Sequence, residues 1–299
     1  MHAIHARRFA HLAAWSGLAL AALTVTPSAQ ASTRSPWPEA GQTAVSIDGA
    51  WSFEGAGPVD TAEPIASVAK VMTAYVVLTD HPLRGREQGP VITVSAADAA
   101  DYRHAARTGE STAAVRAGER ITERQALEAM LLPSANNVAR MLARWDAGGI
   151  RAFTTRENQT AARLGMTHSR YTDPSGLQPS TVSTAPDQLR LAHAALELPA
   201  FAGIVAEPQA DLPVAGTVYN TNRLLGHDGV IGVKTGYTSQ SGACLVFAAV
   251  LTGPDGSRHM IYGATLGQPG GSKALSSPGG PVDRLILAAR GKLAGPGRE

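Results

Sequence analysis

Apolar residues recur in two different rhythms along this chain of 299 residues, and the rhythm changes twice. Near the start, residues 43–48 and 50–54 read as two short strands around Asp48-Gly49, a pair typical of a β-hairpin turn. Over residues 67–78 the apolar positions lie three and four apart, which predicts a helix. After Pro213 the apolar runs again have the length and the glycine boundaries of strands.

The middle of the chain is predicted to be mostly helical. Thr122-Glu-Arg-Gln125 has the spacing of a capping box, which places one helix start there. The further predicted helices are 96–106, 122–132, 136–145, 150–164 and 185–196. Predicted strands follow at 230–235, 243–251 and 259–266, and a last helix at 282–292.

This strand–helix–strand order predicts an α+β (mixed α/β) fold. The most economical arrangement is an antiparallel sheet of about five strands, built from both chain ends and flanked by helices, with an all-α subdomain inserted between them. We expect one domain over residues 43–293, in which residues 67–210 form the mostly helical insert between sheet parts 43–66 and 211–293. From their composition we expect residues 32–42 to be a disordered lead-in and residues 294–299 to be a tail.

The first 31 residues have the composition of an export signal. Arg7 and Arg8 precede an apolar run from Leu12 to Val25, and Ala29-Gln-Ala31 offers a small-x-small cleavage pattern. Because the apolar run is short for a membrane span, we expect residues 1–31 to be a signal peptide for export. An uncleaved N-terminal anchor is the alternative.

Charge and cysteine content argue against several classes of partner. Once Arg7 and Arg8 are set aside, 24 of the 26 basic residues remain against 24 acidic ones, so nothing electrostatic favours a nucleic acid or an anionic membrane surface. Cys244 is the single cysteine, and we expect it to be a small buried hydrophobe. The histidines outside the leader lack ligand spacing, so we expect no metal site.

A first cluster of candidate chemistry is formed by Ser67 and Lys70. Residues three apart share a helix face, and the start of a helix favours a developing alkoxide. Serine is a weak nucleophile until a base takes its proton, and lysine can be that base when desolvation or a nearby cation lowers its pKa. On its own, the pair is more typical of a capping serine beside a surface lysine.

The second cluster, Ser134 and Asn136, lies in a loop between two predicted helices. A hydroxyl there can relay protons to Lys70, and an amide can hold Lys70 and bind a peptide group. The plain alternative is a helix cap.

The third cluster is Lys234-Thr235-Gly236, at the end of a predicted strand. Lys234 and the Thr235 hydroxyl can together bind a carboxylate, and Gly236 leaves room for a substrate against the strand edge. The plain alternative is an edge-strand lysine that discourages aggregation.

The scarcity of lysine favours the functional interpretation of these clusters. Only four of the 26 basic residues are lysines, and two of the four lie in the first and third clusters. A guanidinium stays protonated and cannot act as a base, whereas a lysine amine can.

The order Ser-x-x-Lys, Ser-x-Asn, Lys-Thr-Gly resembles the penicillin-binding proteins and serine β-lactamases. Longer segments are similar to the low-molecular-mass D-alanyl-D-alanine carboxypeptidases of that superfamily, and the resemblance extends over about residues 43–293. The segments are Ala66-Ser-Val-Ala-Lys-Val-Met-Thr73, Leu131-Leu-Pro-Ser-Ala-Asn136, Thr172-Asp-Pro-Ser-Gly-Leu177, Asn220-Thr-Asn-Arg223 and Gly232-Val-Lys-Thr-Gly-Tyr-Thr238.

The resemblance implies a serine-type D-Ala-D-Ala carboxypeptidase with a transpeptidase-like domain and no cofactor. It implies peptidoglycan stems ending in D-Ala-D-Ala as substrates, β-lactam antibiotics as covalent inhibitors, and a place at the cell wall outside the cytoplasm. The implied roles are acyl-ester nucleophile for Ser67, general base for Lys70, proton relay for Ser134, positioning of substrate and Lys70 for Asn136, carboxylate binding for Lys234 and Thr235 beside Gly236, and an oxyanion hole from the backbone N–H groups of Ser67 and Tyr237.

Two departures and two alternatives accompany the resemblance. Asn137 stands where an acid is common in the family, and about sixty residues follow the third motif, so we expect neither an extra C-terminal domain nor a C-terminal membrane anchor. A β-lactam-hydrolysing enzyme of the same fold needs a glutamate for deacylation; Glu157 is the best placed, but Ala161 stands four residues later, where asparagine is typical. A non-catalytic wall-binding or β-lactam-sensing protein is disfavoured because both Lys70 and Lys234 are kept.

Overall fold

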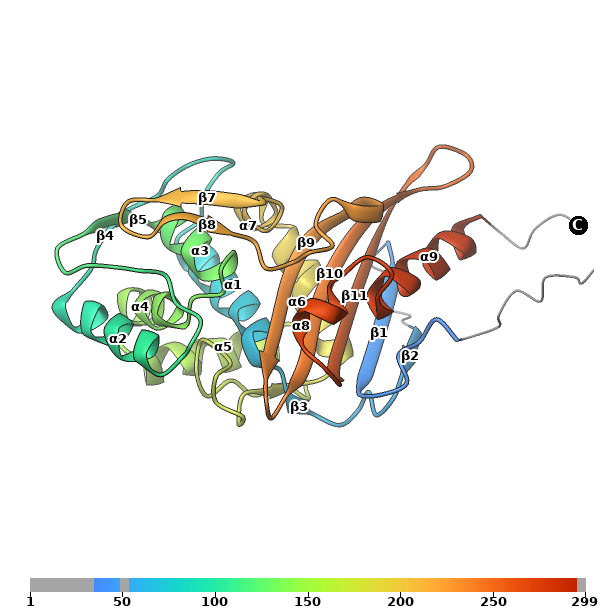
Figure 1. Cartoon of the computed structure of the whole chain (residues 1–299), viewed down its shortest axis with the longest axis horizontal. Helices are drawn as coiled ribbons and strands as arrows, with labels where there is room; N and C mark the ends of the chain where they lie inside the picture. The colour runs from blue at the N-terminus through green and yellow to red at the C-terminus, as the bar shows by residue number, and fades with distance from the viewer. Residues whose placement is uncertain (1–34, 49–53, 295–299) are drawn as a thin grey trace, which may run out of the picture. The chain divides into compact units, whose positions relative to one another are not determined.

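A computed structural model describes residues 35–48 and 54–294 and confirms the predicted fold class. Its centre is a five-stranded antiparallel sheet with the strand order β2-β1-β11-β10-β9 (Figure 1). The strands are β1 (Gln42–Ile47), β2 (Glu54–Ala56), β9 (Val230–Thr238), β10 (Gly242–Thr252) and β11 (Arg258–Gln268). The two chain ends meet where Gln42 pairs with Leu266. The predicted strand 50–54 lies outside the described residues except at Glu54, where β2 begins.

The predicted helices lie close to their expected bounds because the apolar spacing specifies them, and a side-chain cap also fixes the start of some. Thr122 accepts a hydrogen bond from the Gln125 backbone, and the Gln125 side chain caps Thr122 in return, as the capping-box spacing predicted. These helices are α1 (Lys70–Asp80), α2 (Ala96–Arg107), α3 (Glu123–Leu131), α4 (Asn136–Ala147), α5 (Ile150–Arg163), α6 (Ala185–Leu196) and α9 (Pro281–Leu293). The shorter helices α7 (Pro199–Val205) and α8 (Ser272–Leu275) were not predicted.

Short elements that the sequence analysis did not predict connect the larger ones. Three two-stranded ladders join β3 (Glu63–Pro64) with β6 (Val182–Ser183), β4 (Val91–Thr93) with β5 (Arg120–Thr122), and β7 (Gln209–Leu212) with β8 (Gly216–Tyr219). The 3₁₀ turns are η1 (Ala66–Ala69) and η2 (His227–Gly229). These strands hold at most four residues, too few for an alternating pattern to be seen.

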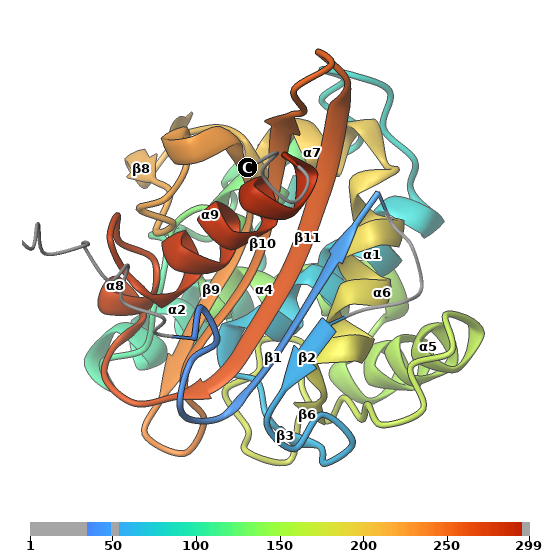
Figure 2. The ribbon, with the colours of Figure 1, turned by 90° about the vertical axis from the view of Figure 1, so that its right-hand side faces the viewer.

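The sheet is buried on both faces, and alternate residues of β10 serve different cores. Cys244, Val246 and Ala248 belong to the core shared with α1 and α6, whereas Leu245 and Phe247 belong to the core shared with α9. Figure 2 shows α9 in front of β10 and β11, with α1 and α6 behind. Burial of Cys244 confirms its predicted character as a small apolar side chain.

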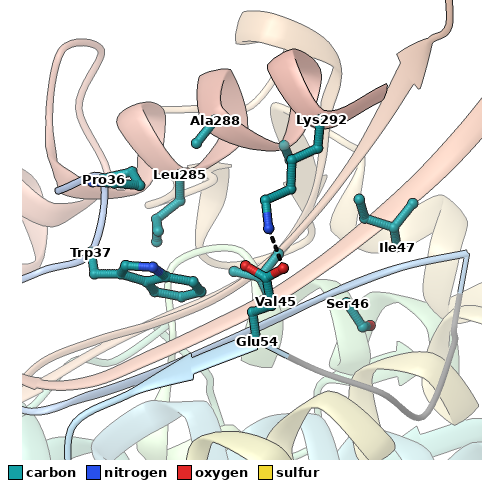
Figure 3. A pocket seen from close by; sticks show the side chains of 10 residues that line it. Pro36, Trp37, Val45, Ser46, Ile47, Glu54, Leu285, Ala288 and Lys292 are labelled. Atoms are coloured by element: carbon teal, nitrogen blue, oxygen red, sulfur yellow. Dashed lines mark hydrogen bonds and ion pairs between the residues drawn. The ribbon is translucent and has the colours of Figure 1, made fainter. Parts of the chain in front are cut away.

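A groove of about 450 Å³ lies between α9 and strands β1 and β2 (Figure 3). Trp37, Val45 and Leu285 supply apolar walls, and Lys292 forms an ion pair with Glu54 across it. Val45 packs against the α9 core, so the groove is on the sheet face away from the helical insert.

In the described part of the chain, no helix is both long and apolar enough to cross a membrane.

Candidate active site

Ser67 lies on η1, the tight turn that leads into α1. Val68, Val71 and Met72 are fully buried and anchor this turn in the core, while Ser67 stays half-buried. Ala66, just before it, has a φ of 47°, a left-handed conformation that is costly for a residue with a Cβ atom. The turn is therefore held by the surrounding structure in a shape that the local sequence does not favour.

The Lys70 amine lies at the centre of the site. Nζ is 2.9 Å from Ser67 Oγ, 2.6 Å from Asn136 Oδ1 and 2.9 Å from the Ser175 carbonyl oxygen. A neutral amine has two N–H groups and one lone pair. The amide and carbonyl oxygens can only accept, so each takes an N–H of Lys70; the charged amine donates a third N–H to Ser67 Oγ, whereas in the neutral amine the lone pair can accept the Ser67 hydroxyl proton. This geometry is that of a base directed at a serine nucleophile.

The electrostatics of Lys70 favour that neutral form. Burial lowers the pKa of Lys70 well below its ordinary value, and the charge of Lys234 lowers it further. Asp173 and Glu110 act in the opposite direction. Because the side chain is fully buried, desolvation lowers the pKa of Lys70 more than the two carboxylates raise it.

The second cluster begins α4. Asn136 is nearly buried, its Oδ1 faces Lys70, and its Nδ2 donates to Glu110 Oε2 at 3.0 Å. Ser134 adopts a φ of 70°, and its buried hydroxyl has no hydrogen-bond partner among the described residues. The structure thus joins Asn136 directly to Lys70, but it does not join Ser134 to either Ser67 or Lys70 by a hydrogen bond.

The third cluster lies at the edge strand β9. Lys234 is buried, its Nζ donates to the Thr235 carbonyl at 3.1 Å, and burial lowers its pKa to about 7. The Thr235 hydroxyl is 2.7 Å from that of Thr221. A Cβ atom on Gly236 would lie 3.1 Å from the backbone nitrogen of Ser67, so glycine allows β9 to pack closely against the nucleophile turn.

The residues of this site lie within a segment that matches a known protein family. The pattern of the family described as D-alanyl-D-alanine carboxypeptidase matches residues 56–256, two thirds of the chain. This chain belongs to that family. It is 35% identical over 211 residues to the D-alanyl-D-alanine carboxypeptidase DacB2 of Mycobacterium tuberculosis, covering 68% of each chain.

A second relative in the family carries a different activity in its name. The chain is 33% identical over 199 residues to a D-alanyl-D-alanine endopeptidase of Pseudomonas aeruginosa. The match covers 64% of this chain and 61% of the length of that relative.

Solved structures support the same family membership. A mutant of the Streptomyces K15 DD-transpeptidase aligns with a TM-score of 0.71 at 26% identity, covering 85% of this chain and 98% of that one. An evolved putative penicillin-binding protein homologue from Mycobacterium tuberculosis aligns with a TM-score of 0.70 at 29% identity, covering 89% and 96%.

The structure also assigns a place to the Thr172–Leu177 segment, for which the sequence analysis gave no role. Asp173 accepts hydrogen bonds from the Ser175 hydroxyl at 2.5 Å and from the Thr181 hydroxyl at 2.6 Å, and these close the loop on itself. A Cβ atom on Gly176 would lie 1.8 Å from the Ala66 carbonyl oxygen, so the loop rests directly on the nucleophile turn. This contact brings the Ser175 carbonyl to Lys70.

Glu157 lies behind the site in neutral form. Thr73 Oγ1 is 2.6 Å from the Pro174 carbonyl oxygen and 2.8 Å from Glu157 Oε1. The carbonyl can only accept, so it takes the single Thr73 hydroxyl proton, and Glu157 must supply the proton of the second bond. Burial raises the pKa of Glu157 well above its ordinary value, consistent with this assignment. Neither Ser67 nor Lys70 is its partner.

Proposed function

We propose that the chain is a serine-type D-Ala-D-Ala carboxypeptidase that trims peptidoglycan stems outside the cytoplasm. The observation that carries the proposal is the buried Lys70 amine, which lies 2.9 Å from Ser67 Oγ while the Asn136 and Ser175 oxygens accept its N–H groups, so that the neutral amine can take the Ser67 proton. Family membership supports the substrate class. The leader proposed for export lies outside the described residues.

In the proposed reaction, Lys70 takes the Ser67 proton as Oγ attacks the carbonyl carbon of the penultimate D-Ala. Backbone N–H groups of Ser67 and Tyr237 stabilise the oxyanion. The proton passes from Lys70, with Ser134 as relay, to the nitrogen of the departing D-Ala as the peptide bond breaks. A water then attacks the acyl ester while Lys70 takes its proton, and Lys70 returns that proton to Ser67 Oγ as the ester bond breaks, which releases the shortened stem and the free serine.

Lys234 and Thr235 are proposed to bind the terminal carboxylate of the stem. Lys234 lies in a desolvated position where a charge without a partner is unfavourable, so an incoming carboxylate both neutralises it and raises its pKa. The Thr235 hydroxyl, beside it on the strand, can donate a second hydrogen bond.

The deciding experiment measures D-Ala release from a diacyl-Lys-D-Ala-D-Ala peptide. Wild type should release D-Ala, and the Ser67→Ala variant should not. Absence of release by wild type, under conditions in which a related carboxypeptidase works, would reject the proposal.

An endopeptidase is the second candidate, because the Pseudomonas relative of similar identity carries that name. An endopeptidase cuts a D-Ala bond whose leaving group continues into a second stem. A cross-linked stem dimer separates the two activities: preferential cleavage of the dimer favours the endopeptidase, and preferential release of free D-Ala favours the carboxypeptidase.

The β-lactam-hydrolysing alternative lacks support from the position of Glu157. Its one bonded oxygen faces Thr73 and its other oxygen is buried with no partner among the described residues, so no contact links it to the nucleophile. We expect a long-lived penicillin adduct on Ser67. Rapid turnover of penicillin would favour hydrolysis instead.

A further inference from the structure

Glu110 lies beside the proposed catalytic residues, in the segment between α2 and β5. Its Oε2 atom accepts from Asn136 Nδ2 at 3.0 Å and from Arg140 Nη1 at 3.0 Å. Arg140 is one turn further along α4, and its Nη2 donates to Asp101 of α2 at 2.8 Å. The arginine therefore holds the same carboxylate oxygen that accepts from the Asn136 amide.

The backbone around Glu110 is tied to the first turn of α4. The Asn136 N–H donates to the Ser111 carbonyl at 2.8 Å. The Asn137 side chain accepts from the Ala113 N–H at 3.2 Å and donates to the Ala113 carbonyl at 3.0 Å. A carboxylate at position 137 could accept but not donate, so the amide explains the departure from the family pattern at this position. Glu110 and Asn136 thus belong to one rigid unit.

The two ends of the Asn136 amide are chemically different, and only one orientation suits this site. With Oδ1 toward Lys70, the amide accepts an N–H and leaves the lysine lone pair to Ser67. A rotated amide would direct its N–H groups at Lys70 and its oxygen at the Glu110 carboxylate, which places donor against donor and acceptor against acceptor. Glu110 therefore excludes the rotated amide.

We propose that Glu110 is a positioning residue that fixes the orientation of the Asn136 amide and, through it, the direction of the Lys70 amine toward Ser67. This inference rests on the proposed function, because it concerns Lys70 as the base of acyl transfer. It assigns a role to a residue that the sequence analysis did not single out.

The charge of Glu110 provides a readout that a purely structural role would not move. Burial, Lys234 and Arg140 lower the pKa of Lys70, whereas Asp173 and Glu110 raise it. Removing the Glu110 charge should therefore lower the pKa of Lys70 and move the acid limb of the acylation rate to lower pH, since Lys70 must be neutral to act as the base.

The test measures the second-order rate constant for acylation by a fluorescent penicillin as a function of pH. Glu110→Ala should be slower by about 10- to 100-fold, the effect of misplacing a catalytic group. Glu110→Gln keeps one oxygen that can accept from both Asn136 and Arg140, so its rate should stay within about five-fold, the difference between a neutral and a charged hydrogen bond. Both variants should show the shifted acid limb.

Glu119→Ala is the matched control. Glu119 lies in the same connecting segment and accepts the Arg116 N–H at 3.0 Å, away from Asn136. Its rate and pH profile should match wild type. In an Asn136→Ala background, adding Glu110→Ala should cause no further loss, because Glu110 acts through that amide.

Two results would overturn the inference: wild-type acylation by Glu110→Ala, or additive losses in the double variant. If Glu110→Ala does not fold, Glu110→Gln decides, and a loss of rate well beyond five-fold would overturn the inference. A wild type that penicillin does not acylate contradicts the proposed function instead. A wild type that is acylated but releases no D-Ala rejects only the carboxypeptidase, and the Glu110 test stands.

Discussion

The two lysines of the site occupy equally buried positions but very different surroundings. Lys70 has three polar contacts supplied by η1, α4 and the loop at Ser175, whereas Lys234 has one, to the carbonyl of its own neighbour. Burial lowers the pKa of both. The surroundings match the proposed roles: at Lys70 two acceptors hold the N–H groups of the neutral amine and leave its lone pair to Ser67, whereas Lys234 has N–H groups left for an incoming anion.

The largest expected effect tests the uniqueness of Lys70. Lys70→Arg keeps a cation but removes the lone pair, so acylation by penicillin should fall roughly 10³-fold, within the range for loss of a general base. Lys234→Arg should lose far less, because charge suffices there. Similar losses in the two variants would contradict the comparison.

Removing the charge at the second lysine should mainly weaken substrate binding. Lys234→Met loses a charged hydrogen bond to the terminal carboxylate, which predicts a rise in KM for the D-Ala-D-Ala peptide of about 10- to 100-fold. Steady-state kinetics measure it, with an amidated peptide as the control: that substrate lacks the carboxylate and should respond little. An equal response to both peptides would show that Lys234 does not bind the carboxylate.

The pH profile should separate the two lysines again. The proposed roles require a neutral Lys70 and a charged Lys234. Because burial lowers the pKa of Lys234 to about 7, kcat/KM of wild type should decline as pH rises above about 7. Arginine stays protonated, so Lys234→Arg should move this alkaline limb upward. An alkaline limb that stays in place would assign it to another group.

The smallest effect is expected at Glu157. Glu157→Gln preserves a donor to Thr73, so penicillin acylation and deacylation should stay within about five-fold of wild type. A large loss of deacylation would reveal the base role that the structure does not support.

Glu157→Gln should also change how stability depends on pH. A carboxyl whose pKa is raised by folding stabilises the native state less as pH increases above its ordinary value of 4.5. The Tm of wild type relative to Glu157→Gln should therefore fall as pH rises above 4.5. A constant difference in Tm would indicate that Glu157 is ionised in the native state.

Much of this protein was determined by local sequence. The apolar spacing and caps specify the main helices, and the strand–helix–strand order specifies a sheet built from both ends, because these signals lie within one element or its immediate neighbours. The three motifs indicated the chemistry, since lysine at positions 70 and 234 stands out in an arginine-rich chain.

Only the tertiary structure decided which atoms surround the lysines and glutamates of the site. Lys70 contacts Asn136 and Ser175, which lie 66 and 105 positions further along the chain. The desolvation of both lysines comes from tertiary packing, which no local sequence pattern reports. Glu110 has no signal in the sequence, and Glu157 was singled out there only as the acid that a β-lactam-hydrolysing enzyme would need. Their different surroundings come from the tertiary structure: Glu110 lies against an arginine and an amide, and Glu157 lies against a hydroxyl whose only proton goes to the Pro174 carbonyl.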